Sequence, residues 1–245
     1  MKKRILSVCV ILTVTTVFLL LGRLPRLLFA VACAAVCCHD ICKALQSAGY
    51  HVTPWIGWLF IALYAPMVWF GAPVAVMPLA FLLIFAALCV SVVSARFKPG
   101  DMLLSLGTCL YPLTPVAFVT CVLCLPAPYW YIVLLTGAAS AAICDTFALF
   151  GGMRFGKHPL APRISPHKTI EGSVCGLLSC IPTGFILYFA FMGTGVQIPV
   201  WGYILVSAVS STFGQMGDLI ASSFKRQAGL KDFSNLIPGH GGMLD

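Results

Sequence analysis

Residues Val74–Val93 read VAVMPLAFLLIFAALCVSVV, a stretch without a single charged side chain. Such a stretch predicts a membrane-crossing helix, because about 20 apolar residues span the hydrocarbon core of a bilayer. The whole chain of 245 residues shares this character, since 60% of it is hydrophobic and only 9% is charged. A typical soluble domain carries about 25% charged residues. We therefore expect an all-α, polytopic transmembrane helical bundle, rather than a soluble domain or an outer-membrane barrel.

Similar apolar runs on both sides of this stretch predict about eight spans. They are approximately 5–21, 24–38, 55–70, 74–93, 102–123, 130–150, 174–191 and 200–220. The first span follows Lys2-Lys3-Arg4 as a signal peptide would, but no small-residue cleavage site follows it, so we expect a retained anchor. We divide the chain into N-terminal membrane helices, 1–128, and a catalytic membrane region, 129–245, with cytoplasmic loops 151–173 and 221–245.

Basic residues predict the orientation of these spans. With a cytoplasmic N-terminus, eight spans place every Lys and Arg on the cytoplasmic side except Arg23 and Arg26, as the positive-inside rule requires. The acidic residues also fall on that side or at the inner ends of spans. We expect an integral protein of a bacterial-type inner (cell) membrane whose polar site faces the cytoplasm. Orientation signals and anionic headgroups then account for the net charge of +8, and no nucleic-acid partner is expected.

Most of the 12 cysteines lie in apolar runs, where Cys behaves as a small hydrophobic residue. One cluster, Cys37-Cys38-His39 with Cys42, contains metal-ligating residue types. It lacks a second ligand pair at the spacing of a zinc finger, so a metal site there is a minor hypothesis. The role of this cluster is left open.

The segment 151–172 is too long and too polar to be a simple connector. Gly151 to Lys157 matches the phosphate-loop pattern G-x-x-x-x-G-K, but His158 replaces the required Ser or Thr and a predicted helix replaces the required strand. The triphosphatase hypothesis therefore fails. Glycines, lysines and a helix start after Ser165-Pro166 would still suit a phosphate group. A basic loop that touches lipid headgroups is the alternative.

A polar stripe runs along the last predicted span. Spacings of four, three, four and three residues place on one helical face Ser211, Gln215, Asp218, Ser222 and Lys225. An aspartate at membrane depth costs about 2.5–3.5 kcal/mol unless it is paired or lines a wet cavity. Asp218 is therefore expected to face protein, where it forms an interhelical contact, binds a cation or relays protons. The same roles are open for Asp145 near the inner end of its own span.

The sequence after this stripe mixes bases, carboxylates and a glycine-rich turn. Residues 225–245 read KRQAGLKDFSNLIPGHGGMLD. This mixture suits a site that handles phosphate oxygens and hard cations together. Mg²⁺ binds through carboxylates and substrate phosphates, while Lys and Arg neutralise phosphate charge.

The segment 223–245 resembles the signature of the phosphatidate cytidylyltransferases, also called CDP-diacylglycerol synthases. The residues that fill the signature in register are Ser222 or Ser223, Lys225, Arg226, Lys231, Asp232, Pro238, His240, Gly241, Gly242 and Asp245. The upstream loop is also similar, in Gly156-Lys157, Ile164-Ser165-Pro166, Lys168-Thr169 and Glu171-Gly172. The N-terminal spans match the family only in character.

The resemblance implies a nucleotidyltransferase that converts CTP and phosphatidate, at the surface of membrane lipids, into CDP-diacylglycerol and pyrophosphate. It implies four catalytic residues: Asp218, Lys225, Arg226 and Asp245. Mg²⁺ would be held by Asp218 and Asp245, with Asp145 as a further candidate ligand and a second cation such as K⁺ nearby. The implied phosphate-binding residues are Lys157, Ser165, Lys168, Thr169, Lys225, Arg226, Lys231, His240, Gly241 and Gly242. Lys168 is expected to approach the segment after Ser222.

Two alternatives stay open. A CTP-dependent polyprenol or phytol-type lipid kinase would share the nucleotide and the membrane setting. A cation-coupled transporter would bury Asp145 and Asp218 in its path, although no paired broken helices support it. The sequence does not assign the cytosine-reading residues, the acyl-chain preference or the oligomeric state, a homodimer being one option.

The family signature continues past the position of Asp245 with an Arg, another Asp and a final membrane helix. We therefore expect this chain to be a truncated form. Ordering the turn 238–245 would then have few packing contacts to offset its entropy cost. Asp245 is expected to be poorly positioned, and the activity to be weak or absent.

Overall fold

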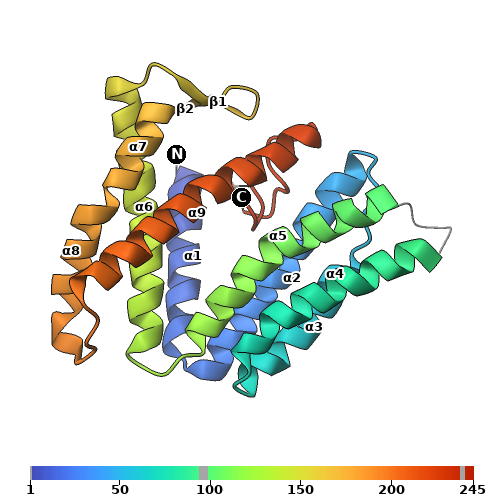
Figure 1. Cartoon of the computed structure of the whole chain (residues 1–245), viewed down its shortest axis with the longest axis horizontal. Coiled ribbons are helices and arrows are strands. Elements are labelled where there is room, and N and C mark those ends of the chain that lie inside the picture. The colour runs from blue at the N-terminus through green and yellow to red at the C-terminus, as the bar shows by residue number, and fades with distance from the viewer. Residues whose placement is uncertain (1, 94–98, 238–240) are drawn as a thin grey trace. The chain divides into compact units, whose positions relative to one another are not determined.

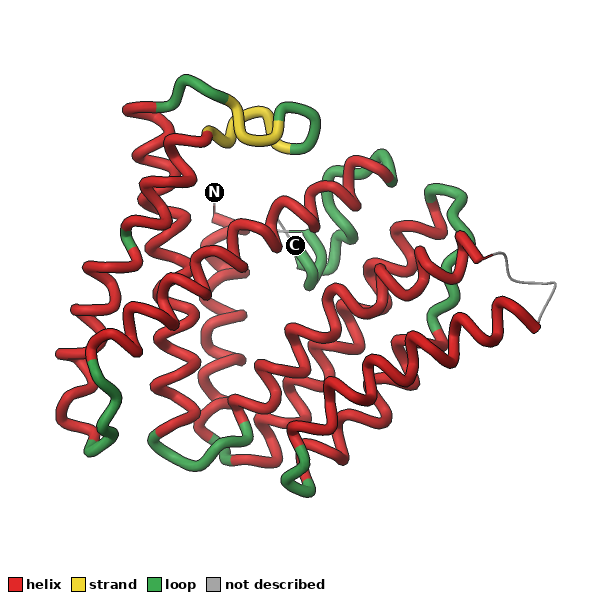
Figure 2. The backbone as a smooth tube through the Cα atoms, viewed as in Figure 1, coloured by secondary structure: helices red, strands yellow, loops and turns green. Residues whose placement is uncertain are grey.

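The computed structural model describes residues 2–93, 99–237 and 241–245, and most of this chain is helical (Figures 1 and 2). Within the described residues, six helical stretches are long and apolar enough to cross a membrane, and Ser7–Leu20 and Trp55–Trp69 are shorter apolar helices. These stretches confirm the predicted all-α, polytopic membrane class. The chain forms two compact units, Met1–Cys124 with Gln227–Asp245, and Leu125–Arg226, which are described separately.

Where the structure describes it, the first unit consists of five helices, a short 3₁₀ turn and the C-terminal tail that follows α9. Its elements are α1 (Lys2–Leu20), α2 (Arg23–Ser47), α3 (Trp55–Trp69), η1 (Pro73–Ala75), α4 (Val76–Val93) and α5 (Pro99–Leu123). α5 packs against α2, α3 and α4, as Figure 1 shows. The side chains buried among these helices include Ile41, Leu45, Phe60, Tyr64 and Leu113.

α2 is longer than its predicted span, which ended at residue 38. The helix continues to Ser47 because the residues after that point are part of the core: Ile41 and Leu45 are fully buried, and Asp40 is only 4% exposed. The run of apolar residues ends at the polar residues after Cys38, whereas the helix continues past them. A polar side chain with a partner inside the protein does not interrupt helical packing.

The second unit contains four helices and a small hairpin. Its elements are α6 (Tyr129–Phe155), β1 (Pro159–Ala161), β2 (Ser165–Thr169), α7 (Ile170–Leu178), α8 (Cys180–Phe191), η2 (Met192–Thr194) and α9 (Val200–Gln227). β1 and β2 pair antiparallel, with Pro159 opposite Thr169 and Ala161 opposite Ser165. The predicted helix start after Ser165-Pro166 is therefore wrong, because these residues pair with β1 and the helix begins only at Ile170.

The predicted span 174–191 is divided into α7 and α8 at Ser179. The physical reason is Pro182, the third residue of α8. A proline has no backbone N–H to donate to the carbonyl four residues earlier, and its ring collides with that carbonyl. The Thr183 hydroxyl donates to the Ser179 carbonyl oxygen at 2.7 Å, which satisfies one acceptor at the break.

α6 and α7 approach each other closely along glycine positions. A Cβ atom on Gly151 would lie 2.4 Å from the Cys175 Cβ, and one on Gly172 would lie 2.6 Å from the Ala148 carbonyl oxygen. Real Cβ contacts are not this short, so only glycine permits the packing. Gly151, the first residue of the pattern that resembled a phosphate loop, therefore permits the close packing of α6 against α7.

Candidate active site

The polar stripe of α9 faces protein, as its spacing predicts. The Ser140 hydroxyl of α6 donates to the Ser207 hydroxyl at 2.9 Å, and the Ser211 hydroxyl donates to the Ser140 carbonyl oxygen at 3.4 Å. One turn later, the Gln215 amide nitrogen donates to the Ser173 carbonyl oxygen of α7 at 3.2 Å. These bonds satisfy polar groups between apolar helices and set the rotation of α9 about its axis.

Asp218 lies at the end of this stripe and pairs with Lys168 of β2. The carboxylate Oδ2 accepts from the Lys168 ammonium. The sequence predicted an approach of Lys168 to the segment after Ser222, whereas its partner here, Asp218, lies one turn before Ser222 on α9. The pair is not buried: the Lys168 side chain is 33% exposed and that of Asp218 is 53% exposed. A partly exposed ion pair contributes little to stability, about 0–1 kcal/mol. Stability alone does not account for this arrangement.

The Lys168–Asp218 pair lines a cavity of ≈ 640 Å³ within the second unit. Its polar wall also includes Asp145, Ser173 and Gln215, while its apolar wall is formed by Leu149, Met153 and Leu160. A volume of this size is typical of small-molecule sites, about 300–1,000 Å³. The cavity thus offers one cation, two carboxylates and an apolar surface to the same ligand.

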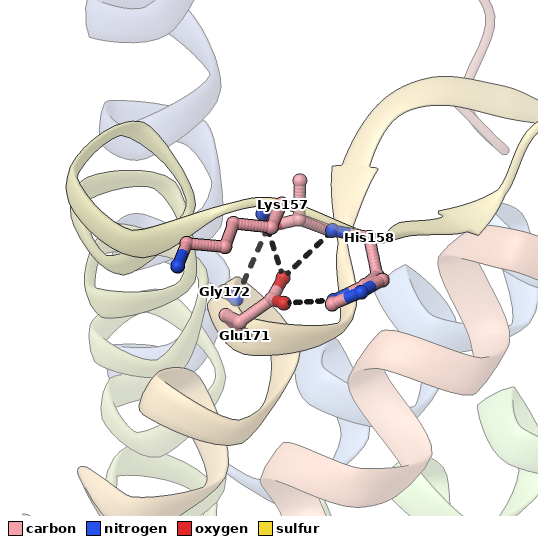
Figure 3. A network of polar contacts seen from close by, with 5 residues as sticks. Lys157, His158, Glu171 and Gly172 are labelled. Atoms are coloured by element: carbon pink, nitrogen blue, oxygen red, sulfur yellow. Dashed lines mark hydrogen bonds and ion pairs between the residues drawn. The ribbon is translucent and has the colours of Figure 1, made fainter.

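Glu171, in the first turn of α7, closes the loop that leads into the hairpin (Figure 3). Its Oε2 accepts from the backbone N–H groups of Lys157 and His158 at 3.1 and 3.2 Å, and its Oε1 lies 2.6 Å from the His158 Nδ1. The Lys157 side chain extends away from this cluster (Figure 3). Glu171 therefore fixes the backbone of the loop, and the Lys157 ammonium is not among the groups that line the cavity.

Some of the remaining predicted site residues line the cavity, and others stabilise the structure around it. Ser165 and Thr169 both line the cavity. The Thr169 hydroxyl also accepts from the Gly172 backbone N–H at 3.1 Å, which makes Thr169 the N-cap of α7. Lys225 and Arg226 lie in the last turn of α9. The Arg226 Nε donates to the Ile164 carbonyl oxygen at 3.5 Å, which places its guanidinium beside the hairpin.

The C-terminal tail, which follows α9 and ends at Asp245, belongs to the first unit and forms a hydrogen-bonded turn. Ile237 and Gly241 form an antiparallel bridge, and the Asp245 Oδ2 accepts from the backbone N–H groups of Phe233 and Gly242 at 2.7 and 3.0 Å. The expectation that this turn has few contacts and a poorly positioned Asp245 is therefore wrong. The reason for expecting weak or absent activity falls with it. Lys231 and Asp232 are exposed on the same tail, while Gly241 and Gly242 are buried. Pro238 and His240, two predicted signature residues, lie outside the described residues.

Asp40 of α2 is a contact of this tail that the sequence analysis missed. Its Oδ2 accepts from the Met243 backbone N–H at 2.9 Å, across 203 positions of sequence. The signal available in the sequence was that Asp40 is the only carboxylate of α2. The predicted metal ligands Asp218 and Asp245 belong to different units. Among the described residues, no group of three His, Cys, Asp or Glu side chains is close enough to hold a metal, and this includes Cys37, Cys38 and Cys42.

Comparison with known proteins shows the family to which this chain belongs. The model of the cytidylyltransferase family matches residues 2–245. The chain belongs to the cytidylyltransferase family. Its matches include the phosphatidate cytidylyltransferases of Staphylococcus haemolyticus, 43% identical over 103 residues, and of Haemophilus influenzae, 41% identical over 116 residues. That of Staphylococcus aureus is 46% identical over 104 residues.

These matches cover part of each protein. They span 42% of this chain for the two staphylococcal proteins and 47% for the Haemophilus protein, and 38% of the length of each relative. The family assignment confirms the predicted resemblance and supports an enzyme of the nucleotidyltransferase class. It lends no support to the transporter hypothesis.

Proposed function

We propose that this protein transfers the cytidylyl group of CTP to phosphatidate, giving CDP-diacylglycerol and pyrophosphate. The observation that carries the proposal is the cavity in which Lys168 meets Asp218. A phosphorylated lipid and a nucleotide bring phosphate charge next to apolar chains, and this cavity has charged and apolar walls together. The names of the bacterial relatives support the same reaction. A cell-membrane location with the site facing the cytoplasm is part of the proposal, and it rests on the apolar helices and on the distribution of the basic residues.

The proposed reaction is a phosphoryl-type displacement. A phosphate oxygen of phosphatidate attacks the α-phosphorus of CTP and forms the new P–O bond. The bond from the α-phosphorus to the bridging oxygen of the β-phosphate breaks, and its electron pair leaves with pyrophosphate. Such a step needs little covalent help from the protein, so catalysis depends on positioning and charge stabilisation.

The residues of the second unit divide these tasks in the proposal. Lys168 binds phosphate oxygens. Before substrate binds, Asp218 keeps the Lys168 ammonium in place. Lys225 and Arg226 extend the positive charge from the last turn of α9, and the guanidinium of Arg226 is already held beside the hairpin. Arg binds phosphate through two parallel hydrogen bonds, which orients the group as well as neutralising it.

The oxygen-rich wall of the cavity fits Mg²⁺. Asp145, Asp218, Gln215 and Ser173 offer carboxylate, amide and hydroxyl oxygens, and Mg²⁺ characteristically binds one or two carboxylates together with substrate phosphates. When bound there, Mg²⁺ would neutralise charge on the phosphates of CTP. Asp218 and Asp145 are the proposed ligands in this cavity. The ligand role implied for Asp245 and the second cation, such as K⁺, stay predictions.

The proposal is tested by identifying the product. Purified protein in mixed micelles receives radiolabelled CTP with Mg²⁺, and the lipid fraction is resolved by chromatography. With phosphatidate as acceptor, we expect a labelled lipid that co-migrates with CDP-diacylglycerol, together with release of pyrophosphate. With CTP labelled at the γ-phosphate, no label is expected to enter the lipid.

The acceptor arms separate the alternatives. A polyprenol or phytol-type kinase would move the γ-label into a polyprenol and release CDP, whereas the proposed enzyme leaves a polyprenol unlabelled. Diacylglycerol, which lacks the attacking phosphate, is the matched control for phosphatidate. Absence of labelled CDP-lipid with phosphatidate, under conditions where the protein is folded, would refute the proposal.

A further inference from the structure

Asp40 is the only acidic residue of α2, and it is buried. It lies in α2, which is long and apolar enough to cross a membrane, and only 4% of the residue is exposed. Aspartate is almost never buried without a partner, and a carboxylate at such a position is costly to keep. The chain therefore places a charge-bearing group where packing alone would favour an apolar one.

The partner of this carboxylate is the glycine-rich turn of the tail. The Asp40 Oδ2 accepts from the Met243 N–H at 2.9 Å, and the neighbouring Gly242 N–H donates to the Asp245 Oδ2 at 3.0 Å. Two successive amides are thus held by two carboxylates. A Cβ atom on Gly242 would lie 2.5 Å from the Asp40 Oδ2, so the approach requires glycine at this position.

The Asp245 carboxylate depends on the shape of this turn. Its Oδ2 bridges the N–H groups of Phe233 and Gly242, and Gly241 has a φ of 102°, in the left-handed region that favours glycine. The hydrogen bond from the Met243 N–H to Asp40 joins this turn to α2. Rotation of the backbone at Met243 would move the Gly242 N–H and, with it, the carboxylate that accepts from it.

We propose that Asp40 is a positioning residue for cytidylyl transfer: it holds the turn 241–245 against α2 and thereby fixes the Asp245 carboxylate. The inference rests on the proposed function, and it assigns Asp40 no contact with substrate. A carboxylate that is already held in place has little conformational freedom left to lose when substrate and cation bind. The entropy cost of binding is therefore smaller, and affinity and rate both increase.

The first arm of the test measures the turn itself, without activity. Hydrogen exchange of the peptide that contains Met243 is compared in wild type, Asp40→Ala and Asp40→Asn. Asp40→Ala removes the acceptor, and exchange at Met243 should rise about 10- to 100-fold, the usual effect of losing a hydrogen bond to a charged group. Asp40→Asn keeps an acceptor oxygen and should retain most of the protection. His39→Ala, on the exposed neighbour in the same helix, is the control and should exchange as wild type does.

The second arm asks whether positioning matters for the reaction. Mn²⁺ serves as the probe, and its binding to purified protein is measured by paramagnetic resonance alongside CDP-lipid formation. Asp40→Ala should weaken Mn²⁺ binding and raise the CTP concentration needed for half-maximal rate, and Asp40→Asn should restore most of both. If Asp40→Ala does not fold, Asp40→Ser, whose shorter side chain withdraws the acceptor oxygen from the Met243 N–H, should give the same pattern.

Each outcome decides the proposal. Unchanged exchange at Met243 in Asp40→Ala would show that Asp40 does not hold the turn. Faster exchange with unchanged Mn²⁺ binding and unchanged CTP dependence would show a structural contact only, and would also overturn the proposal. A wild-type protein that makes no CDP-lipid would refute the proposed function instead, while the exchange and Mn²⁺ arms would still judge Asp40.

Discussion

Replacing Lys168 by methionine separates a catalytic role of the Lys168–Asp218 pair from a structural one. The substitution keeps most of the length of the side chain and removes its charge. Because Lys168 is 33% exposed and Asp218 is 53% exposed, solvent screens the pair and its loss should cost less than about 1 kcal/mol of stability. If Lys168 stabilises phosphate charge in the transition state, the rate should fall about 10²–10³-fold, as it does when an enzyme loses one such donor.

Two measurements on the same preparation decide between these roles. Thermal unfolding in detergent reports the stability, and initial rates of CDP-lipid formation report the catalytic effect. Arg163→Met is the matched control, since Arg163 is an exposed base in the turn of the same hairpin. It should leave both quantities close to those of wild type, because no role in the cavity is assigned to it.

The reverse pattern would refute this reasoning. If Lys168→Met lowered the unfolding midpoint markedly while the rate stayed near that of wild type, the ion pair would be a structural link between β2 and α9. An Arg163→Met variant as slow as Lys168→Met would show instead that the general charge of the hairpin matters, rather than the position of Lys168.

Three further predictions concern the frame around the cavity. Glu171→Ala should speed hydrogen exchange at the two loop amides it binds, and unchanged exchange would contradict its role in closing the loop. Gly172→Ala, which places a Cβ 2.6 Å from a carbonyl oxygen of α6, should destabilise the protein by about 1–3 kcal/mol, whereas Gly193→Ala meets no atom within 4 Å and should not. Gln215→Leu, which loses bonds to α6 and α7, should lower stability by about 0.5–1.5 kcal/mol; an unaltered unfolding midpoint would contradict this.

The helical class and most spans follow from sequence because hydropathy reports burial in lipid directly. The spacing of Ser211, Gln215 and Asp218 was also sufficient to predict that they share one face of a helix, since a 3.6-residue period fixes which side chains lie together. In each case the deciding information lies within one helix or one short motif.

What the sequence did not reveal depends on contacts between distant segments. The hairpin at Pro159–Thr169 is short, and its pairing depends on the loop that Glu171 closes rather than on strand propensity. Asp40 and Met243 are separated by 203 positions, so neither local periodicity nor composition could connect them. The turn of the tail combines both kinds of contact: Asp245 accepts from the nearby Phe233 and Gly242, whereas Met243 donates to Asp40 on α2.

The most direct test of the central claim is a comparison of wild type with Asp218→Asn in a single assay of CDP-diacylglycerol formation from CTP and phosphatidate, with Mg²⁺ varied. The substitution preserves size and hydrogen bonding but removes the charge that pairs with Lys168 and is proposed to bind Mg²⁺. Asp101→Asn, at the start of α5, is the matched carboxylate control and should behave as wild type. We predict that wild type makes CDP-diacylglycerol and that Asp218→Asn loses at least about 100-fold in rate, with its unfolding midpoint unchanged. Equal synthesis by Asp218→Asn and wild type at every Mg²⁺ concentration would contradict the account.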